Sequence, residues 1–501
     1  MFALSTWGTN AGALTSASAG KSGGALTITL PGITWPTLDP ATSSVAELDG
    51  SIESAIFGAL IEVGPHSTLV PDEATGWHFS DHGLRFDMTI RHGLRFQDGT
   101  PFNAEAVASS MKRDLDPANA CLCLADFGGV TSVSAPSQYD VRLTLRTPNY
   151  VLPADFIDDP MNWTVSPTSL KRGTAAVNQH PVGAGPFEVV SNQASNVITL
   201  KRFPGYWQKG QPYLNSLKFL STTADASDLN AIESGSTQLT SVTTVPLWEQ
   251  ARTMPGLRTY KQQGVNLAFV RLNTKAPPFN NILAREAVNY ATNPAPIDKA
   301  LYKNVFPLIQ GWTSPYMLFY QKHVPNYPKY NLAKARSLVR KLGGLKFTVI
   351  VNTTPIAVEQ ADALSAQWRA AGMTVSISQQ TIPAQTQDLK RNDWQTISAG
   401  WAGCDVDPGD CAPINFASTG LFTPAKDPAL DRLIDKAAGS PSPTVRKGYY
   451  DKINEYLNAH FYFTWLWAQP TLMVARNNVE GLPTSVGLDG PFNWETVWMK
   501  G

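Results

Sequence analysis

The chain has 501 residues, which is enough for two or three domains with complete hydrophobic cores. Its 40 Lys and Arg side chains balance its 40 Asp and Glu side chains, which argues against nucleic acid or an anionic membrane surface as the main partner. Charged residues make up only 16% of a sequence with 37 Gly and 37 Pro, and this composition favours a loop-rich globular protein of mixed α and β structure over a disordered one.

The first 24 residues are rich in Ala, Ser, Gly and Thr, and this composition predicts a flexible tail. The tail lacks the basic start and the apolar run of a complete secretory signal, although Ala17-Ser18-Ala19 fits a signal-peptidase site. We therefore expect a truncated or mis-started signal. The sequence contains no run of 18 apolar residues, which is the length that a transmembrane helix needs.

Alternating apolar residues predict a series of strands in the first half of the chain. In the stretch 74–107 we expect two short strands, and Leu84, Phe86, Met88 and Ile90 lie on the buried face of the second. Further strands are expected at 25–30, 139–145, 187–190, 197–202 and 214–219. Helical periodicity and start signals predict helices at 45–60, 104–113 and 228–234.

The second half begins with a predicted strand at 265–273, and a return crossing is expected at 472–475. Between them the pattern predicts helices at 282–291, 331–342, 358–371 and 445–457, and strands at 345–351 and 374–378. The strand, helix and strand from 345 to 378 indicate a parallel α/β arrangement in this part of the chain.

The stretch 74–107, ATGWHFSDHGLRFDMTIRHGLRFQDGTPFNAEAV, closely resembles the signature of the extracellular solute-binding proteins that serve peptide/nickel-type ABC importers. The positions that match that pattern are Trp77, Ser80, Gly83, Arg91, Gly93, Phe96, Asp98, Gly99, Pro101, Ala104 and Val107. None of them is poised for catalysis.

Several further motifs follow the same family in the same order. They are Leu38-Asp39-Pro40, the segment HPVGAGPF at 180–187, the segment PGYW at 204–207, and Asn273 with Pro277-Pro278-Phe279. The resemblance therefore extends from about residue 25 to residue 501, and it rests on ordered motifs rather than on one short pattern.

The resemblance implies an α/β fold, namely a bilobal periplasmic-binding-protein-like clamshell with mixed sheets. It also implies two hinge-crossing strands and a subdomain inserted in the first lobe. After the tail at 1–24, we expect lobe I to comprise 25–46, 180–264 and 476–501, the subdomain to comprise 47–179, and lobe II to comprise 265–475.

The segment WAGCDVDPGDC, which begins at Trp401, is the first candidate for the ligand site. In similar proteins an aspartate three residues after this tryptophan anchors the ligand's α-ammonium, because a buried carboxylate and an ammonium compensate each other's desolvation. Here Cys404 holds that position, and Asp405 follows it, while Asp407 keeps its place. Either Asp405 substitutes after a shift of the loop, or Asp405, Asp407 and Asp410 cap turns.

The strand at 265–273 and two loops supply further candidates. Phe269 and Arg271 share a strand face, and the resemblance places both in the cleft. Arg271 would hold a ligand carboxylate or phosphate, or else form a solvent-facing or inter-lobe ion pair. Ser44 would approach from lobe I. Asn352 ends a strand in lobe II, where ligands of open α/β sheets bind.

The four cysteines form two closely spaced pairs. Cys404 and Cys411 flank a turn-rich segment, and we expect them to form a disulfide outside the cytoplasm. Cys121 and Cys123 are spaced too tightly to be bridged without strain. A zinc site built from both pairs would have an unusual spacing, and a calcium loop would need an acidic or amide residue where Gly409 stands. We expect no metal and no cofactor.

The resemblance implies the extracytoplasmic substrate-binding component of an ABC importer, which captures a peptide or a similar small polar or amphipathic solute between two lobes and delivers it to a membrane permease. Within the family, the ligand would alternatively be an oligosaccharide, a metal chelate or an antibiotic-like compound. A secreted hydrolase is the reading outside the family. The one G-x-S-x-G match, at 20–24, lies in the tail with no strand before it, so we expect no catalytic residues. The expected state is a monomer in the periplasm or at the outer face of the cell membrane.

Overall fold

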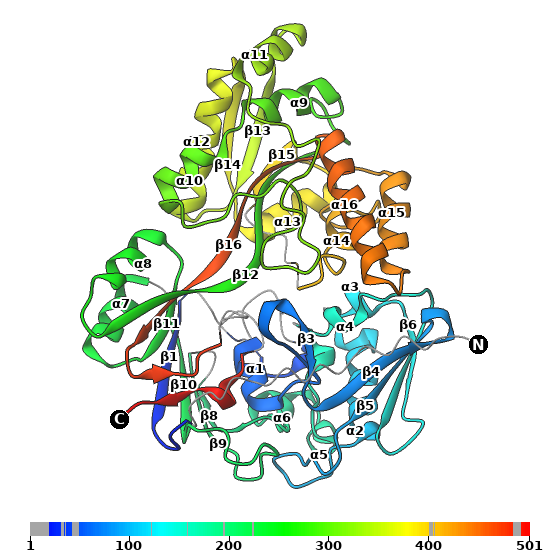
Figure 1. The fold of residues 1–501 in the computed structure, drawn as a ribbon, viewed down its shortest axis with the longest axis vertical. Helices are drawn as coiled ribbons and strands as arrows, with labels where there is room; N and C mark the ends of the chain where they lie inside the picture. The colour runs from blue at the N-terminus through cyan, green and yellow to red at the C-terminus, as the bar shows by residue number, and fades with distance from the viewer. Residues whose placement is uncertain are drawn as a thin grey trace.

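The computed structural model describes residues 20–31, 35, 37–42, 50–121, 123–157, 159–193, 196–222, 225–399, 404, 406–483 and 492–501. The described chain forms two lobes, which are joined by the long strands β12 (Leu257–Leu272) and β16 (Phe463–Arg476) (Figure 1). These strands are antiparallel partners along most of their length, with an irregular register between Gln262 and Asn266. The pair therefore carries the chain from one lobe to the other and back.

One ten-stranded sheet runs through both lobes in the order β14-β13-β15-β12-β16-β11-β1-β10-β9-β8. In lobe I its strands are β1 (Ala25–Pro31), β8 (Phe187–Gln193), β9 (Val197–Arg202), β10 (Ser216–Thr222) and β11 (Leu239–Val242). In lobe II they are β13 (Lys346–Val351), β14 (Thr374–Gln379) and β15 (Thr396–Ala399). Because β13 pairs in parallel with both β14 and β15, the parallel arrangement predicted from the sequence is confirmed.

Lobe II adds helices around its part of the sheet (Figure 1). These are α9 (Ile282–Ala291), α10 (Pro294–Tyr302), α11 (Leu332–Lys341), α12 (Pro355–Ala370), α13 (Ile382–Arg391), α14 (Ala412–Phe416), α15 (Pro428–Ala438) and α16 (Pro443–Ala459). A second apolar cluster of this lobe lies between β12, β16 and α14 to α16, and it includes Phe269, Trp465 and Tyr450.

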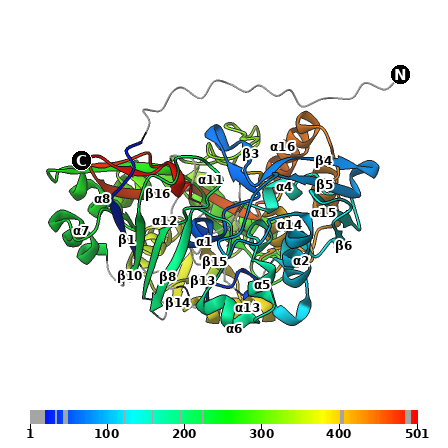
Figure 2. The ribbon, with the colours of Figure 1, turned by 90° about the horizontal axis from the view of Figure 1, so that it is seen from below.

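Lobe I contains the inserted subdomain, a four-stranded sheet in the order β4-β5-β7-β6. Its strands are β4 (Ala74–Ser80), β5 (Arg85–Ile90), β6 (Val130–Ser134) and β7 (Asp140–Leu145), and its helices are α2 (Ala104–Asp114), α3 (Leu124–Phe127), α4 (Leu152–Asp155), α5 (Pro167–Leu170) and α6 (Thr174–Gln179). The segment that precedes β4 adds α1 (Gly50–Phe57), β2 (Ile61–Val63) and β3 (Leu69–Pro71). The remainder of the lobe adds α7 (Asp225–Ser234), α8 (Val245–Arg252), β17 (Val479–Glu480) and β18 (Trp498–Met499). Figure 2 shows the subdomain sheet and strands β1, β8 and β10 at opposite ends of the lobe.

Strand β5 shows why the alternating pattern predicts this sheet. Phe86, Met88 and Ile90 are buried on one face, as the period of two requires. Asp87 breaks the pattern, because it is also buried, and its carboxylate accepts a hydrogen bond of 2.6 Å from Arg142 on β7. On the polar face of the strand, Asp87 is thus covered by its ion pair with Arg142, whereas Arg85 is exposed.

The signature stretch fastens the subdomain to the rest of lobe I. Gln97 Nε2 donates to the carbonyl oxygens of Ile56 at 2.7 Å and Phe187 at 2.8 Å, so it connects α1 to β8. Asp98 accepts from the Ser166 hydroxyl at 2.5 Å and from the Thr100 amide at 3.0 Å. Partial burial raises the pKa of Asp98, but these hydrogen bonds outweigh it, and the pKa lies below its ordinary value. The motif is a framework element.

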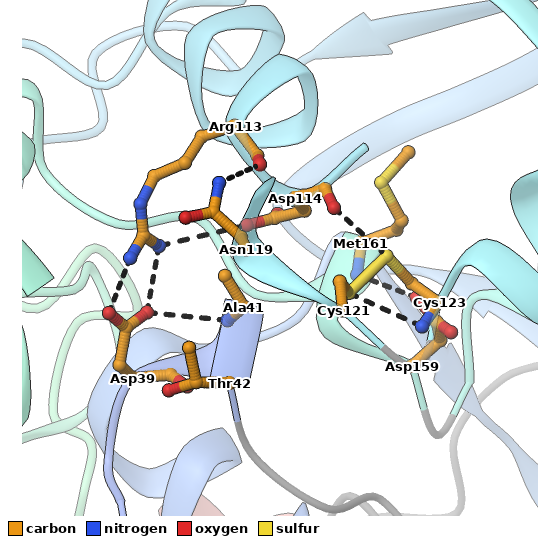
Figure 3. The surroundings of a disulfide bond; sticks show 10 residues. All are labelled: Asp39, Ala41, Thr42, Arg113, Asp114, Asn119, Cys121, Cys123, Asp159 and Met161. Carbon is orange, nitrogen blue, oxygen red and sulfur yellow. Dashed lines mark hydrogen bonds and ion pairs between the residues drawn. A yellow bond between two sulfur atoms is a disulfide. The ribbon is translucent and has the colours of Figure 1, made fainter. Parts of the chain in front are cut away.

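The Leu38-Asp39-Pro40 motif has a similar structural role (Figure 3). Asp39 is fully buried, accepts from the Ala41 amide at 3.3 Å, and pairs with Arg113 near the end of α2, whose Nη1 lies 2.7 Å from Asp39 Oδ1. A buried carboxylate requires such a partner, because its desolvation is otherwise uncompensated. The motif therefore ties the segment after β1 to the subdomain.

Next to this pair, Cys121 and Cys123 are joined by a disulfide, with 5.2 Å between their Cα atoms (Figure 3). The sequence left open whether these two cysteines are paired. The chain turns between α2 and α3, and this turn brings the two side chains to the same side, where Cys123 Sγ also contacts the Asp114 carbonyl oxygen at 3.4 Å.

Candidate inter-lobe ligand site

A short loop in lobe II is closed by the disulfide between Cys404 and Cys411, with 4.8 Å between their Cα atoms. We call residues 404–411 the disulfide loop; its residue 405 lies outside the described part of the chain. Both sulfur-bearing side chains are buried in the apolar cluster that contains Phe269 and Tyr450. The disulfide joins the two ends of the loop, and the second end leads directly into α14.

Asp407 is the buried polar centre of the disulfide loop. Its Oδ1 accepts from the Gly409 amide at 3.0 Å and from the Tyr450 hydroxyl at 2.8 Å, and its Oδ2 lies 3.2 Å from Nη1 of Arg446. Burial raises the pKa of Asp407, while Arg446 and the two hydrogen bonds oppose the rise. Burial and the neighbouring Asp407 raise the pKa of Tyr450 well above its ordinary value, so its hydroxyl stays a donor.

The disulfide loop contacts lobe I directly. Val406 is buried in the apolar cluster whose other members all come from residues 60–184 of lobe I. Arg446 Nη1 donates to the carbonyl oxygen of Tyr150 at 2.6 Å, and the Tyr150 amide donates to the Ala438 carbonyl oxygen at 2.7 Å. In Figure 1 the helices α15 and α16 accordingly stand over α3 and α4. The two lobes are therefore in contact in this structure.

A second contact between the lobes involves the turn between β2 and β3. The Ser67 hydroxyl, in the turn between β2 and β3, donates to the Tyr316 carbonyl oxygen of lobe II at 2.5 Å. Leu318, two residues after Tyr316, donates its amide to the Val406 carbonyl oxygen at 2.7 Å, so this contact is connected to the disulfide loop. Any guest between the lobes would be enclosed by residues that belong to both of them.

A cavity of about 460 Å³ lies beside the disulfide loop, between the subdomain and helices α14 and α15. Its lining includes the four acidic residues Asp126, Asp155, Asp410 and Asp435, and among the described residues that line it there is no Lys, Arg or His. Asp126 is exposed as a whole residue, but desolvation of its carboxyl group raises its pKa to about 6. Burial and the neighbouring Asp431 raise the pKa of Asp435. The cavity therefore disfavours a negatively charged guest.

Phe269 and Arg271 lie inside lobe II. Phe269 is fully buried and makes edge contacts with Phe463 and Trp465, at ring distances of 5.3 Å and 5.5 Å. The guanidinium of Arg271 lies 5.0 Å from the Phe269 ring, and its Nη2 donates to Asn415 Oδ1 at 2.6 Å. Burial lowers the pKa of Arg271 to about 9. Since Asn415 belongs to α14 and its Nδ2 donates to the Cys411 carbonyl oxygen, Arg271 is connected to the disulfide loop.

Asn352 lies where the sequence predicted it, directly after β13, and it is half-buried. Its Oδ1 accepts from the Thr354 amide at 3.0 Å and from the Thr354 hydroxyl at 2.6 Å, so it shapes the turn that leads into α12. Trp401, Asp405 and Ser44 lie outside the described residues. The structure thus groups Phe269, Arg271 and the disulfide around one apolar cluster, and Asn352 is not part of it.

Sequence reasoning missed Arg446, Tyr450 and Tyr150. Arg446 and Tyr450 are four residues apart on α16 and therefore share a helix face, which the sequence does show. Their partner Asp407 is 43 residues from Tyr450, and no local pattern connects positions so far apart. The contact of Arg446 with Tyr150 uses a backbone carbonyl oxygen, for which the side-chain sequence carries no signal at all.

The cysteine sulfur atoms are not available as thiolate ligands, because all four cysteines are disulfide-bonded. Cys404, Asp410 and Cys411 hold potential donor atoms within 4.8 Å of one another, but the two sulfur atoms of this group are bonded to each other. A zinc site at this position would require the bond to be broken.

The model for the middle region of the bacterial extracellular solute-binding proteins, family 5, matches residues 68–421. The chain belongs to this family. The match contains the signature stretch, the crossing strand β12 and the disulfide loop, so it covers both lobes. Among the described residues, no helix is both long and apolar enough to cross a membrane.

Curated relatives include the glutathione-binding protein GsiB of Escherichia coli O6:K15:H31 (strain 536 / UPEC), which is 27% identical over 315 residues. That alignment covers 62% of this chain and 60% of the relative, so the chain matches about three fifths of the relative's length. A similar solved structure is the periplasmic binding protein DppA of Helicobacter pylori in complex with the peptide STSA, with a TM-score of 0.81, 22% identity and 96% and 99% of the two chains covered. Another is NikZ of Campylobacter jejuni in complex with Ni(L-His), with a TM-score of 0.79, 19% identity and 93% and 97% covered. These structures share the bilobal fold.

Proposed function

We propose that this protein is the extracytoplasmic substrate-binding component of an ABC importer, and that it captures a peptide or a similar small polar or amphipathic solute between its lobes. Family membership supports the class of protein. The observation that carries the proposal is the contact of lobe II with lobe I through Val406 of the disulfide loop and through Arg446 of α16. A ligand that touches both lobes would favour this docked arrangement by a population shift, and a membrane permease would receive the docked form.

The division into lobes is part of the proposal. We propose that residues 25–46, 180–264 and 476–501 form lobe I, that 47–179 form its subdomain, and that 265–475 form lobe II. The pairing of β12 with β16 supports a crossing near 265, because the register is irregular between Gln262 and Asn266. On β16 the same irregularity falls between Gln469 and Thr471, a few residues before the proposed boundary at 475. The protein would act as a monomer, because each chain contains both halves of its own cleft.

For the ligand contacts we propose Trp401, Asp405 and Ser44 together with Asn352. We propose that Phe269, Arg271 and Asp407 act from behind this surface. The burial of Arg271 and Asp407 supports a positioning role, because each is held by side chains of lobe II. Replacing Trp401 by Ala should weaken ligand binding. Unchanged affinity would remove Trp401 from the site.

The proposal is tested with a panel of compounds that includes the ligands named for the relatives and the structural neighbours. Reduced glutathione, the peptide Ser-Thr-Ser-Ala and a nickel–histidine complex are titrated into the protein by calorimetry, and native mass spectrometry of the purified protein identifies any retained ligand. We expect binding of a peptide-like compound and its full recovery without modification. Consumption of the compound would overturn the proposal in favour of a hydrolase, and absence of any ligand in both experiments would refute the peptide assignment.

Arg271 offers a matched test of ligand charge. If its guanidinium acts on the ligand, Arg271→Met should weaken the binding of anionic compounds selectively, because neutral compounds gain little from the field of a buried cation. An equal loss for neutral and anionic compounds would show instead that Arg271 supports α14 and the disulfide loop through Asn415.

A further inference from the structure

We propose that Arg446 is a positioning residue that couples the disulfide loop to lobe closure. This inference deepens the proposed function, on which it rests, because it assigns a regulation to the same site. The single guanidinium of Arg446 contacts Asp407 of the disulfide loop at 3.2 Å and the Tyr150 carbonyl oxygen of lobe I at 2.6 Å. One side chain therefore bridges the loop that precedes α14 and the opposite lobe.

The position of Arg446 is fixed from three sides. Its guanidinium carbon lies 5.2 Å from the centre of the Phe319 ring, and its side chain is 11% exposed. The Tyr450 hydroxyl, one helical turn further along α16, holds the other oxygen of Asp407 at 2.8 Å. Since an arginine in such a place retains little rotamer freedom, its contact with Tyr150 depends directly on where Asp407 lies.

The disulfide loop supplies the second half of the coupling. Val406, which precedes Asp407, is buried in the apolar cluster of lobe I. At Gly409 an added Cβ would lie 2.7 Å from Val151 Cγ2, so loop and lobe I meet without spare room there. A displacement of the loop would therefore withdraw Val406 from lobe I and at the same time move Asp407 away from Arg446. The apolar and the charged contacts between the lobes form or break together.

The coupling predicts how ligand binding changes the lobe equilibrium. In a protein whose docked form is only partly populated, the apparent affinity for a ligand falls by the fraction that is competent to bind. Removing Arg446 would lower that fraction without removing any group that we assign to ligand contact. The loss of affinity should then equal the loss of the docked population, measured without ligand.

The test measures the ratio of docked to separated lobes in the ligand-free protein by fluorescence energy transfer. Fluorophores are attached through unnatural amino acids at the exposed positions Gln138, in the subdomain, and Lys341, at the end of α11. Arg446→Met should lower the ratio about tenfold, the factor that one charge-assisted hydrogen bond provides. The control Lys447→Met removes the neighbouring cation, whose partner Asp451 lies on the same helix, and should leave the ratio unchanged within about twofold.

Two further variants keep the inference falsifiable if Arg446→Met lowers overall stability. Arg446→Lys retains a positive charge but has one donor head in place of the guanidinium fork, so it should restore part of the ratio. Val406→Ala leaves the charges intact and removes apolar contact with lobe I, so it should lower the ratio roughly three- to tenfold. A ratio that Arg446→Met and Val406→Ala leave unchanged would overturn the inference. Because these measurements contain no ligand, they remain decisive even if every compound of the panel fails to bind.

Discussion

Removal of the Cys404–Cys411 disulfide tests how much the bond stabilises the disulfide loop in its place against lobe I. The bond closes a loop with a sequence separation of 7. For a closed loop of about 8 residues, the chain-entropy relation gives a loss of about 8.3 cal/mol/K, or about 2.5 kcal/mol at 25 °C. Cys404→Ala/Cys411→Ala should therefore destabilise the loop by about 2.5 kcal/mol. Alanine is chosen rather than serine because a serine hydroxyl group would be buried in the apolar cluster.

Native-state hydrogen exchange of the backbone amides at 406, 407 and 409–411 measures this free energy locally. A change of about 2.5 kcal/mol corresponds to exchange that is about 70-fold faster, if the loop opens without global unfolding. The matched control is Cys121→Ala/Cys123→Ala, which opens a loop of about three residues worth about 1.6 kcal/mol and should leave exchange in the disulfide loop unchanged. Unchanged exchange in Cys404→Ala/Cys411→Ala would show that contacts with lobe I and Tyr450, rather than the bond, hold the loop in place.

Further predictions concern charge and packing at other sites. Asp126 lines the cavity that lobe II residues also line, and burial raises its pKa from 3.8 to about 6. If lobe II supplies that burial, docking should weaken as the pH rises from about 4 to about 6 and stay flat above that. Energy transfer between the lobes measures this, and a pH profile that Asp126→Asn leaves unchanged would show that lobe I alone causes the shift. Asp39→Asn leaves Arg113 without its buried carboxylate and should lower the free energy of unfolding in urea by about 3 kcal/mol. The control Asp81→Asn breaks an exposed ion pair with Arg85 and should lower it by less than about 1 kcal/mol, so equal losses would contradict the buried role of Asp39. Gly409→Ala places a Cβ 2.3 Å from the Tyr450 hydroxyl and should lower the free energy of unfolding by about 1–3 kcal/mol. The control Gly448→Ala lies on α16 with nothing within 4 Å of the added Cβ, and it should raise the free energy of unfolding by about 0.5–1 kcal/mol. A stabilised Gly409→Ala variant would show that the disulfide loop has room for the added methyl group.

Elements with strong local signals could be predicted from the sequence. Helix α9 occupies 282–291, as expected, because the Asn281 side chain accepts from the Leu283 amide at 2.9 Å and starts the helix. Strand β9 likewise occupies 197–202. The helix expected at 45–60 is described only from Gly50 to Phe57, and it ends because Gly58 takes a φ of +77° and closes the last turn. Glycine in that conformation is a stop signal that the apolar period alone does not contain.

Other elements escaped prediction for physical reasons. Helices α3 to α6 have four to six residues each, which is too short for a helical period to be visible. Helix α15 does carry a start signal in the sequence, since Asp427 caps it and Pro428 follows at its first position. The inter-lobe contacts of Arg446 and Tyr150 depend on how two lobes meet, and that is a property of the assembled chain rather than of any segment.

The family motifs describe the framework of this protein, and this explains why they predict its fold better than its ligand. The hydrogen bonds of Gln97, Asp98 and Asp39 go to the backbone and side chains of lobe I, where they hold α1, β8 and α2 in place. Proteins with the same framework are named for different cargoes, a peptide in one structure and a nickel–histidine complex in another. The ligand must therefore be selected by residues that the framework merely carries. Under the proposed function the disulfide loop is such a segment, because it would join the proposed ligand contacts Trp401 and Asp405 to Val406, which contacts lobe I, and to Asp407, which binds Arg446. Changing the loop should alter selectivity and closure together, while changing Gln97 or Asp98 should alter stability alone.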